Sequence, residues 1–132
     1  MTVNSSPLEE LLVSKSELDE NLLRDVLKPF IKIENETGEY IFTPKFSDLT
    51  LRQKIIVILL GQKAKVRLNL TQKEEVRPKD LEYLLGEKGN SIRPALKELR
   101  RKGLISYGKD GYFIHNALIY KAKNYLLASE KK

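Results

Sequence analysis

The chain has 132 residues, of which 41% are hydrophobic, so it is long enough for one compact core and too short for two full domains. It has no cysteine and one histidine, His115, which excludes a disulfide framework, a thiol nucleophile and a histidine metal cluster. The longest apolar run, 55–60, is far shorter than a membrane span, and residues 1–6 lack the features of a signal peptide. We therefore expect a cytoplasmic protein with no membrane partner and no cofactor.

The charge is divided unevenly along the chain. Residues 1–49 carry five Lys and Arg against ten Asp and Glu, a net charge of −5, whereas residues 50–132 carry nineteen against eight, a net charge of +11. A positive field concentrated on a small domain favours polyanions, with nucleic acid first and anionic membrane surface second. The alternative is a solvated lysine-rich surface without a partner.

The first 48 residues predict an acidic extension made of helix and hairpin. Residues 7–13 favour a short amphipathic turn or helix, and Ser16 can cap a helix that ends at Pro29. The alternation of residues 30–34 and 40–43 around a turn predicts a β-hairpin. We divide the chain into this extension (1–48), a main domain (49–127) and a basic tail (128–132).

The main domain begins with a helix predicted over about 51–68. Thr50 and Gln53 have the spacing of a capping box, and apolar residues around most of the circumference indicate a central helix. Its second half is basic through Lys63, Lys65 and Arg67, which we expect to reach solvent.

Two short helices follow, joined by a turn that contains glycine. Pro78 fits the start of the first helix and Gly86 its end. We expect Asn90 or Ser91 to cap the second helix, 90–102, which places Pro94 in the first turn, where its missing N–H costs nothing. Gly103 suits the end of this second helix.

The remaining residues predict a hairpin over 104–114, with a glycine-flanked loop at 108–111, and a last helix over 116–127 capped by Asn116. On a helical wheel, the second helix of the pair separates its residues into two faces. Ile92, Ala95, Leu96 and Leu99 form an apolar face, and Arg93, Lys97, Arg100 and Arg101 gather opposite them. Such a cationic ridge fits the major groove of B-DNA, although it is also what a solvated surface helix can carry.

The stretch VRPKDLEYLLG (76–86), followed by GNSIRPALKEL (89–99) and KGLI (102–105), resembles the helix-turn-helix of winged-helix regulators, especially small archaeal ones. The resemblance covers about residues 50–127. It implies an α+β fold, a winged helix-turn-helix domain with helix 90–102 in the major groove of double-stranded DNA and hairpin 104–114 as the wing. The candidate DNA-binding residues are Asn90, Ser91, Arg93, Lys97, Arg100, Arg101 and Lys109.

Within this set, Arg93 is placed to reach base edges, Lys97 bases or phosphates, and Arg100 and Arg101 the backbone. Lys109 can rest in the minor groove or on phosphate, or can be a plain polar turn residue. We assign no metal or catalytic residue and expect no enzyme, because no nucleophile, base and orienting group occur together.

The leading hypothesis is a transcription regulator that forms a homodimer through helices 17–28 and 116–127. The alternative for these helices is that they only cover the domain. The alternative function is a winged-helix adaptor in a replication, repair or transcription complex, and RNA also remains open as a ligand. The acidic extension can recruit a protein partner, or fold back on the basic face and weaken DNA binding.

Overall fold

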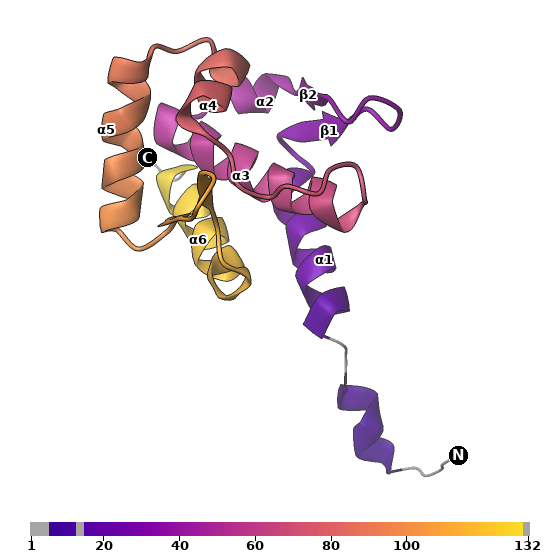
Figure 1. The fold of residues 1–132 in the computed structure, drawn as a ribbon. Helices are drawn as coiled ribbons and strands as arrows, with labels where there is room; N and C mark the ends of the chain where they lie inside the picture. Colours follow the sequence, from indigo (N-terminus) through magenta and orange to yellow (C-terminus); the bar gives the residue numbers. More distant parts are fainter. Residues whose placement is uncertain (1–5, 13–14, 131–132) are drawn as a thin grey trace.

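The computed structural model describes residues 6–12 and 15–130, without the side chains of residues 15–18, 129 and 130. They form an α+β fold of helices with two small hairpins (Figure 1). The elements in chain order are the 3-10 helix η1 (Pro7–Leu11), α1 (Lys15–Leu27), β1 (Ile31–Ile33), β2 (Tyr40–Phe42), α2 (Pro44–Ser47), α3 (Leu51–Arg67), α4 (Pro78–Leu85), α5 (Gly89–Arg101), β3 (Ser106–Tyr107), β4 (Tyr112–Phe113), the 3-10 helix η2 (Asn116–Leu118) and α6 (Ile119–Glu130).

Helix α3 is the centre of the fold. Residues 55–60 are all fully buried, because α1, α4, α5, α6 and β4 pack around this helix. The predicted capping box is confirmed: the Thr50 hydroxyl accepts a hydrogen bond from the Gln53 N–H at 3.2 Å, and the Gln53 side chain accepts one from the Thr50 N–H at 2.9 Å. A capped helix buried along its middle turns is the scaffold on which the other elements are placed.

The acidic N-terminal part shares this core. Helix α1 packs against α3 and α6, and α1, the β1–β2 hairpin and α2 contribute buried apolar residues to the same cluster as α3. These residues are Leu23, Val26, Leu27, Phe30, Ile31 and Phe46. The expected boundary near residue 48 therefore does not interrupt the hydrophobic core.

The apolar stripes of α1 and α6 face inward. On α6, Ile119, Ala122 and Leu126 are buried, as are the apolar residues of α1 named above. The packing therefore favours the alternative in which these helices cover the domain. Helix α6 also continues to Glu130, past the predicted end at residue 127, and the last two lysines of the basic tail lie outside the described residues.

Helices α4 and α5 have the predicted glycines at their ends but not the predicted cap. Gly86 ends α4 with a φ of 66°, and Gly103 follows α5 with a φ of 75°. The expectation that Asn90 or Ser91 caps α5 was wrong, since the helix begins at Gly89 after Lys88. Pro94 consequently lies inside the helix, in its second turn, and deprives the Asn90 carbonyl of its intrahelical donor.

The second hairpin gains a third strand-like segment. Strands β3 and β4 pair antiparallel, and Val76 exchanges two hydrogen bonds with Tyr112 of β4, at 2.9 and 2.8 Å. Gly111 is required beside this bridge: its φ is 147°, and a Cβ atom there would lie 2.6 Å from the Val76 carbonyl oxygen. The order of α3, Val76, α4, α5 and hairpin is compatible with a winged helix.

Lys63 differs from the sequence expectation, because its side chain is buried and does not reach solvent. Its ammonium group lies 2.6 Å from the Glu74 carboxylate and 2.6 Å from the Asn116 side-chain oxygen. The Asn116 side chain is therefore bonded to Lys63. Asn116 is the first residue of η2, and the residue before this helix is His115, so the prediction that Asn116 caps the last helix was also wrong. A buried charge is tolerated where partners from distant segments meet it.

Candidate nucleic-acid interface

Helix α5 stands at one edge of the molecule (Figure 1), and its basic residues Arg93, Lys97, Arg100 and Arg101 are exposed. Its residues Ile92, Ala95, Leu96 and Leu99 are buried, and it packs against α3 and α4. The predicted separation of an apolar and a basic face on this helix is therefore confirmed. All seven candidate residues are exposed, namely Asn90, Ser91, Arg93, Lys97, Arg100 and Arg101 on α5 and Lys109 in the hairpin loop.

The beginning of α5 is shaped by Gly89. A Cβ atom on Gly89 would lie 2.7 Å from the Arg93 guanidinium and 2.9 Å from the Glu82 carboxylate of α4. The Arg93 side chain thus lies back along the first turn of α5, over the glycine backbone and close to Glu82. Because these are the flexible ends of exposed or half-buried side chains, Arg93 can swing toward a ligand without disturbing the core.

The end of α5 carries a charge pair that sequence analysis missed. Arg101 donates hydrogen bonds to both carboxylate oxygens of Glu98, at 2.7 and 2.8 Å, and the Lys102 ammonium lies 3.7 Å from the same group. The hydrogen bond from Arg101 lowers the pKa of Glu98 and raises the pKa of Arg101. The i, i+3 spacing of these residues was the available signal.

Arg100 connects the helix to the hairpin. Its guanidinium carbon lies 5.6 Å from the centre of the Tyr107 ring, and the Tyr107 and Tyr112 rings are 4.8 Å apart. Tyr107 is 56% exposed, so the cation and the aromatic face form one surface between α5 and β3. Sequence analysis had given Tyr107 no role beyond its place in the hairpin predicted over 104–114.

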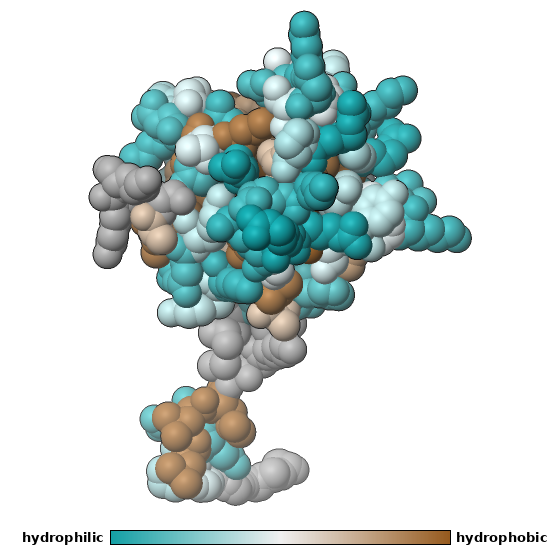
Figure 2. Space-filling model, turned by 90° about the vertical axis from the view of Figure 1, so that its left-hand side faces the viewer, coloured by the Kyte–Doolittle hydropathy of each residue, from teal (hydrophilic) through white to brown (hydrophobic). Residues whose placement is uncertain are grey.

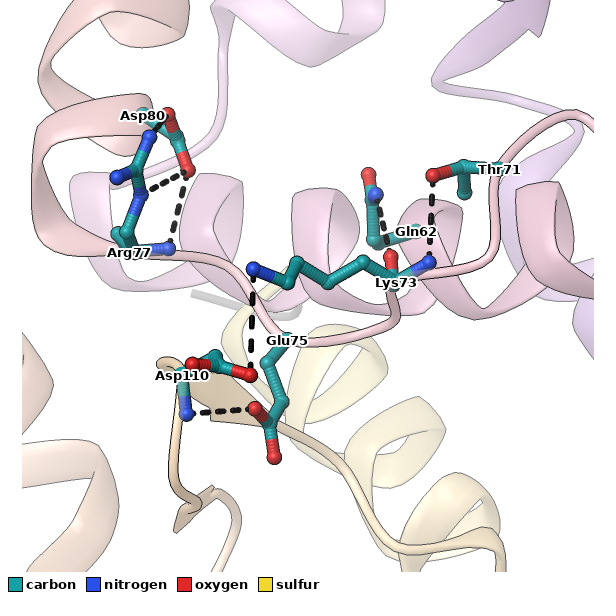
Figure 3. Close-up of polar contacts among 7 residues, drawn as sticks. All are labelled: Gln62, Thr71, Lys73, Glu75, Arg77, Asp80 and Asp110. Carbon is teal, nitrogen blue, oxygen red and sulfur yellow. Dashed lines mark hydrogen bonds and ion pairs between the residues drawn. The ribbon is translucent and has the colours of Figure 1, made fainter.

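The loop of the β3–β4 hairpin is anchored by Glu75 (Figure 3). The Glu75 carboxylate accepts a hydrogen bond from the Asp110 N–H at 2.7 Å and also lies against Gly108, while the Asp110 carboxylate is 3.9 Å from the Lys73 ammonium. Two carboxylates therefore offset Lys73 and Lys109 around the loop. The hairpin is held in place by these contacts but presents little net positive charge.

The described part of the chain holds no group of three or more His, Asp or Glu residues arranged to bind a metal ion. None of the described helices is long and apolar enough to cross a membrane.

Comparisons with protein-family models, with curated proteins and with solved structures find no match to this chain. The functional argument consequently depends on the geometry of α5 and the elements around it.

Proposed function

We propose that this protein binds double-stranded DNA as a winged helix-turn-helix protein and acts as a transcription regulator. The observation that carries the proposal is the two-faced character of α5: four apolar residues are buried against α3 and α4, and six polar or basic residues on the exposed surface are available to a ligand. A helix that packs on the core through one face and presents cations on the opposite face has the shape and charge to fit the major groove of DNA.

In the proposed complex, the first turns of α5 meet base edges. Arg93 can donate two hydrogen bonds to a guanine, and Asn90 and Ser91 lie in the first turn, where short polar side chains reach bases or phosphates. Lys97 follows one turn after Arg93. Arg100 and Arg101 lie further along the helix and contact the phosphate backbone, which supplies affinity without sequence preference.

The hairpin serves as the wing in this proposal. Lys109 at its tip contacts phosphate or the minor groove, while Glu75 fixes the loop and prevents it from adapting freely. Because the charges around the loop are balanced, the wing mainly orients the protein on the duplex, and α5 supplies most of the phosphate neutralisation.

The test measures fluorescence anisotropy of labelled duplexes over a series of salt concentrations. The binding constant should fall steeply with salt, with a log-log slope of about −0.9 per phosphate neutralised. The variant Arg93→Ala/Lys97→Ala should bind weakly. Arg24→Ala/Lys28→Ala, in the last turn of α1 and just after it, loses the same charge and should bind like the parent. A flat salt dependence, or equal loss in both variants, would remove α5 as a DNA-binding element. Selection from random duplexes then identifies the preferred site.

The second candidate function is a winged-helix adaptor that binds another protein. The specific observation that favours it is the exposed apolar surface outside α5, of which Leu8, Leu11 and Leu12 are 70–77% exposed. An adaptor should bind every duplex weakly and with equal affinity, and unlabelled DNA of any sequence should compete equally. Single-stranded and double-stranded RNA belong in the same competition, because a basic winged helix can also bind RNA.

A further inference from the structure

The N-terminal 3-10 helix η1 carries leucines that no described part of the same chain covers. Leu8, Leu11 and Leu12 are 70%, 77% and 75% exposed. In Figure 2 the apolar side chains of this segment form a group that stands apart from the body of the molecule. The Ser6 side chain accepts a hydrogen bond from the Leu8 N–H at 3.1 Å, so the turn that presents these leucines is already capped.

An apolar groove lies at the other end of α1. It has a volume of about 550 Å³ and is formed by α1, β1 and the last turn of α3. Its apolar lining includes Leu23, Leu27, Ile31, Ala64 and Leu68, and Leu68 is 60% exposed. A groove of this size can receive two or three leucine side chains from a short helix laid into it.

The charges on η1 and at the groove are complementary. Glu9 and Glu10 lie between the exposed leucines of η1, and Lys28 and Lys32 line the groove. Within the described residues, none of these four side chains forms an ion pair. Glu20 and Arg24 line the groove as well, but they form ion pairs with Arg67 and Asp25. A leucine-rich acidic turn and an apolar groove with unpaired lysines therefore match in both polarity and charge.

The chain length prevents a helical η1 from lying along the whole groove of its own molecule. Only two residues separate Leu12 from the first residue of α1, and the groove begins at Glu20. Folded back along α1 as a helix, residues 7–12 would extend about 9 Å at about 1.5 Å per residue. They would reach only the start of the groove, because Glu20 lies about 8 Å along α1 from Lys15 and Leu27 about 18 Å. The helical segment of a second molecule has no such restriction.

We propose that η1 of one molecule docks into the α1–β1–α3 groove of a second copy of this chain, and that the exchange is reciprocal. Each copy then contributes one leucine segment and one groove, which gives a closed two-fold dimer. The inference goes beyond the proposed function and does not depend on it, because no residue of α5 takes part.

The test is the oligomeric state of the full chain, measured by sedimentation equilibrium over a range of protein concentrations. The parent should be a dimer. Leu8→Glu/Leu11→Glu on η1, and separately Leu68→Glu in the groove, should each raise the dimer dissociation constant at least about tenfold. Because these side chains are exposed, the two variants should have the same melting temperature when both are measured as monomers. Leu127→Glu on α6, also an exposed leucine, is the matched control and should remain dimeric.

Mixing and charge reversal separate exchange between molecules from other contacts. The η1 variant keeps its groove and the groove variant keeps its η1, so an equimolar mixture should form a heterodimer through one intact contact. Glu9→Lys/Glu10→Lys should weaken the dimer, and Lys28→Glu/Lys32→Glu in the same chain should restore it. A parent that is monomeric at every concentration, or a dimer lost only in Leu127→Glu, would overturn the inference.

Discussion

The exposed arginines of α5 differ in whether they already form a charge pair within the protein. Arg93 lies in the second turn of the helix over Gly89 and has an exposed side chain, whereas Arg101 is held by both oxygens of Glu98. A guanidinium already bonded to a carboxylate brings less net charge to a ligand than an unpaired one. The two arginines therefore should not contribute to DNA binding in the same way.

For this reason we expect Arg93→Ala and Arg101→Ala to have different effects. Loss of Arg93 should cost about 1–3 kcal/mol on the preferred duplex and relax the preference at one base position. Loss of Arg101, which contacts the phosphate backbone in the proposed complex and is paired with Glu98, should weaken all sequences alike and reduce the salt slope by less than about 1. Both positions are exposed, so melting curves should stay close to the parent's. Parent-like binding by both variants to preferred and scrambled duplexes would show that α5 is not the DNA-binding element.

The buried ammonium of Lys63 gives a prediction about stability. Glu74→Ala leaves this charge with only Asn116 as a side-chain partner, and loss of a hydrogen bond to a charged group should destabilise the fold by about 1.5–3 kcal/mol. The double variant Lys63→Met/Glu74→Ala removes the charge as well and should be more stable than Glu74→Ala alone. Urea denaturation of the two variants and the parent measures the difference, and the reverse order of stability would contradict this account.

At the level of elements, the glycine that ends α4 and the glycine of the β3–β4 hairpin have different structural roles. Gly86 ends α4 with a positive φ, but a Cβ atom there would meet nothing within 4 Å. Gly111 has a positive φ and lies against the Val76 backbone, which belongs to a paired strand segment and cannot move aside. A side chain at Gly86 would therefore be strained only by the positive φ. A side chain at Gly111 would be strained by its φ and would also collide with the Val76 backbone.

We accordingly expect Gly86→Ala to destabilise the protein by about 1–2 kcal/mol, the cost of a left-handed conformation for a residue with a Cβ atom. Gly111→Ala should destabilise it by more, because the new methyl group overlaps backbone and breaks the Val76–Tyr112 pairing. Thermal unfolding of both variants tests the order. Equal losses would mean that the hairpin loop can shift away from Val76.

At the level of the whole molecule, the acidic N-terminal part is both a component of the core and a carrier of exposed leucines. Asp19 and Glu20 lie 3.6 and 3.9 Å from the Arg67 guanidinium, so part of the acidic charge pairs with α3. In Figure 1, α1 lies away from α5. The arrangement gives no support to the expectation that this segment folds back over the basic face.

Truncation should separate these two roles. Removal of residues 1–12 takes away η1, and the described residues of this segment, 6–12, are all exposed, so the melting temperature of the monomer should be preserved. A chain that starts at Leu49 loses Leu23, Leu27 and Phe30 among others and should fail to fold cooperatively, since each buried large apolar side chain contributes about 1.5–3 kcal/mol. Circular dichroism on heating distinguishes the two. A cooperative transition in the shorter chain would show that residues 49–130 fold by themselves.

Local signals predicted much of the framework. The Thr50–Gln53 box, the glycine ends of α4 and α5, and the two faces of α5 depend on residues within one or two turns of each other. The start of α5 was missed because neither Lys88 nor Gly89 has the side chain of a helix cap, and glycine favours a turn. The candidate residues on α5 could be predicted because helical periodicity places them on its exposed face. The Glu98–Arg101 pair could also have been predicted from its i, i+3 spacing, but it was overlooked.

By itself, the sequence determined the charge asymmetry, the central position of α3 and the basic outer face of α5, because composition and helical periodicity are properties of neighbouring residues. Only the tertiary structure decided that Lys63 meets Asn116, that Glu75 anchors the loop at Asp110, and that the N-terminal part belongs to the common core. These contacts join residues 53 and 35 positions apart, or segments on either side of residue 48. Which distant polar groups meet depends on how the helices pack, and helical periodicity carries no information about that partner.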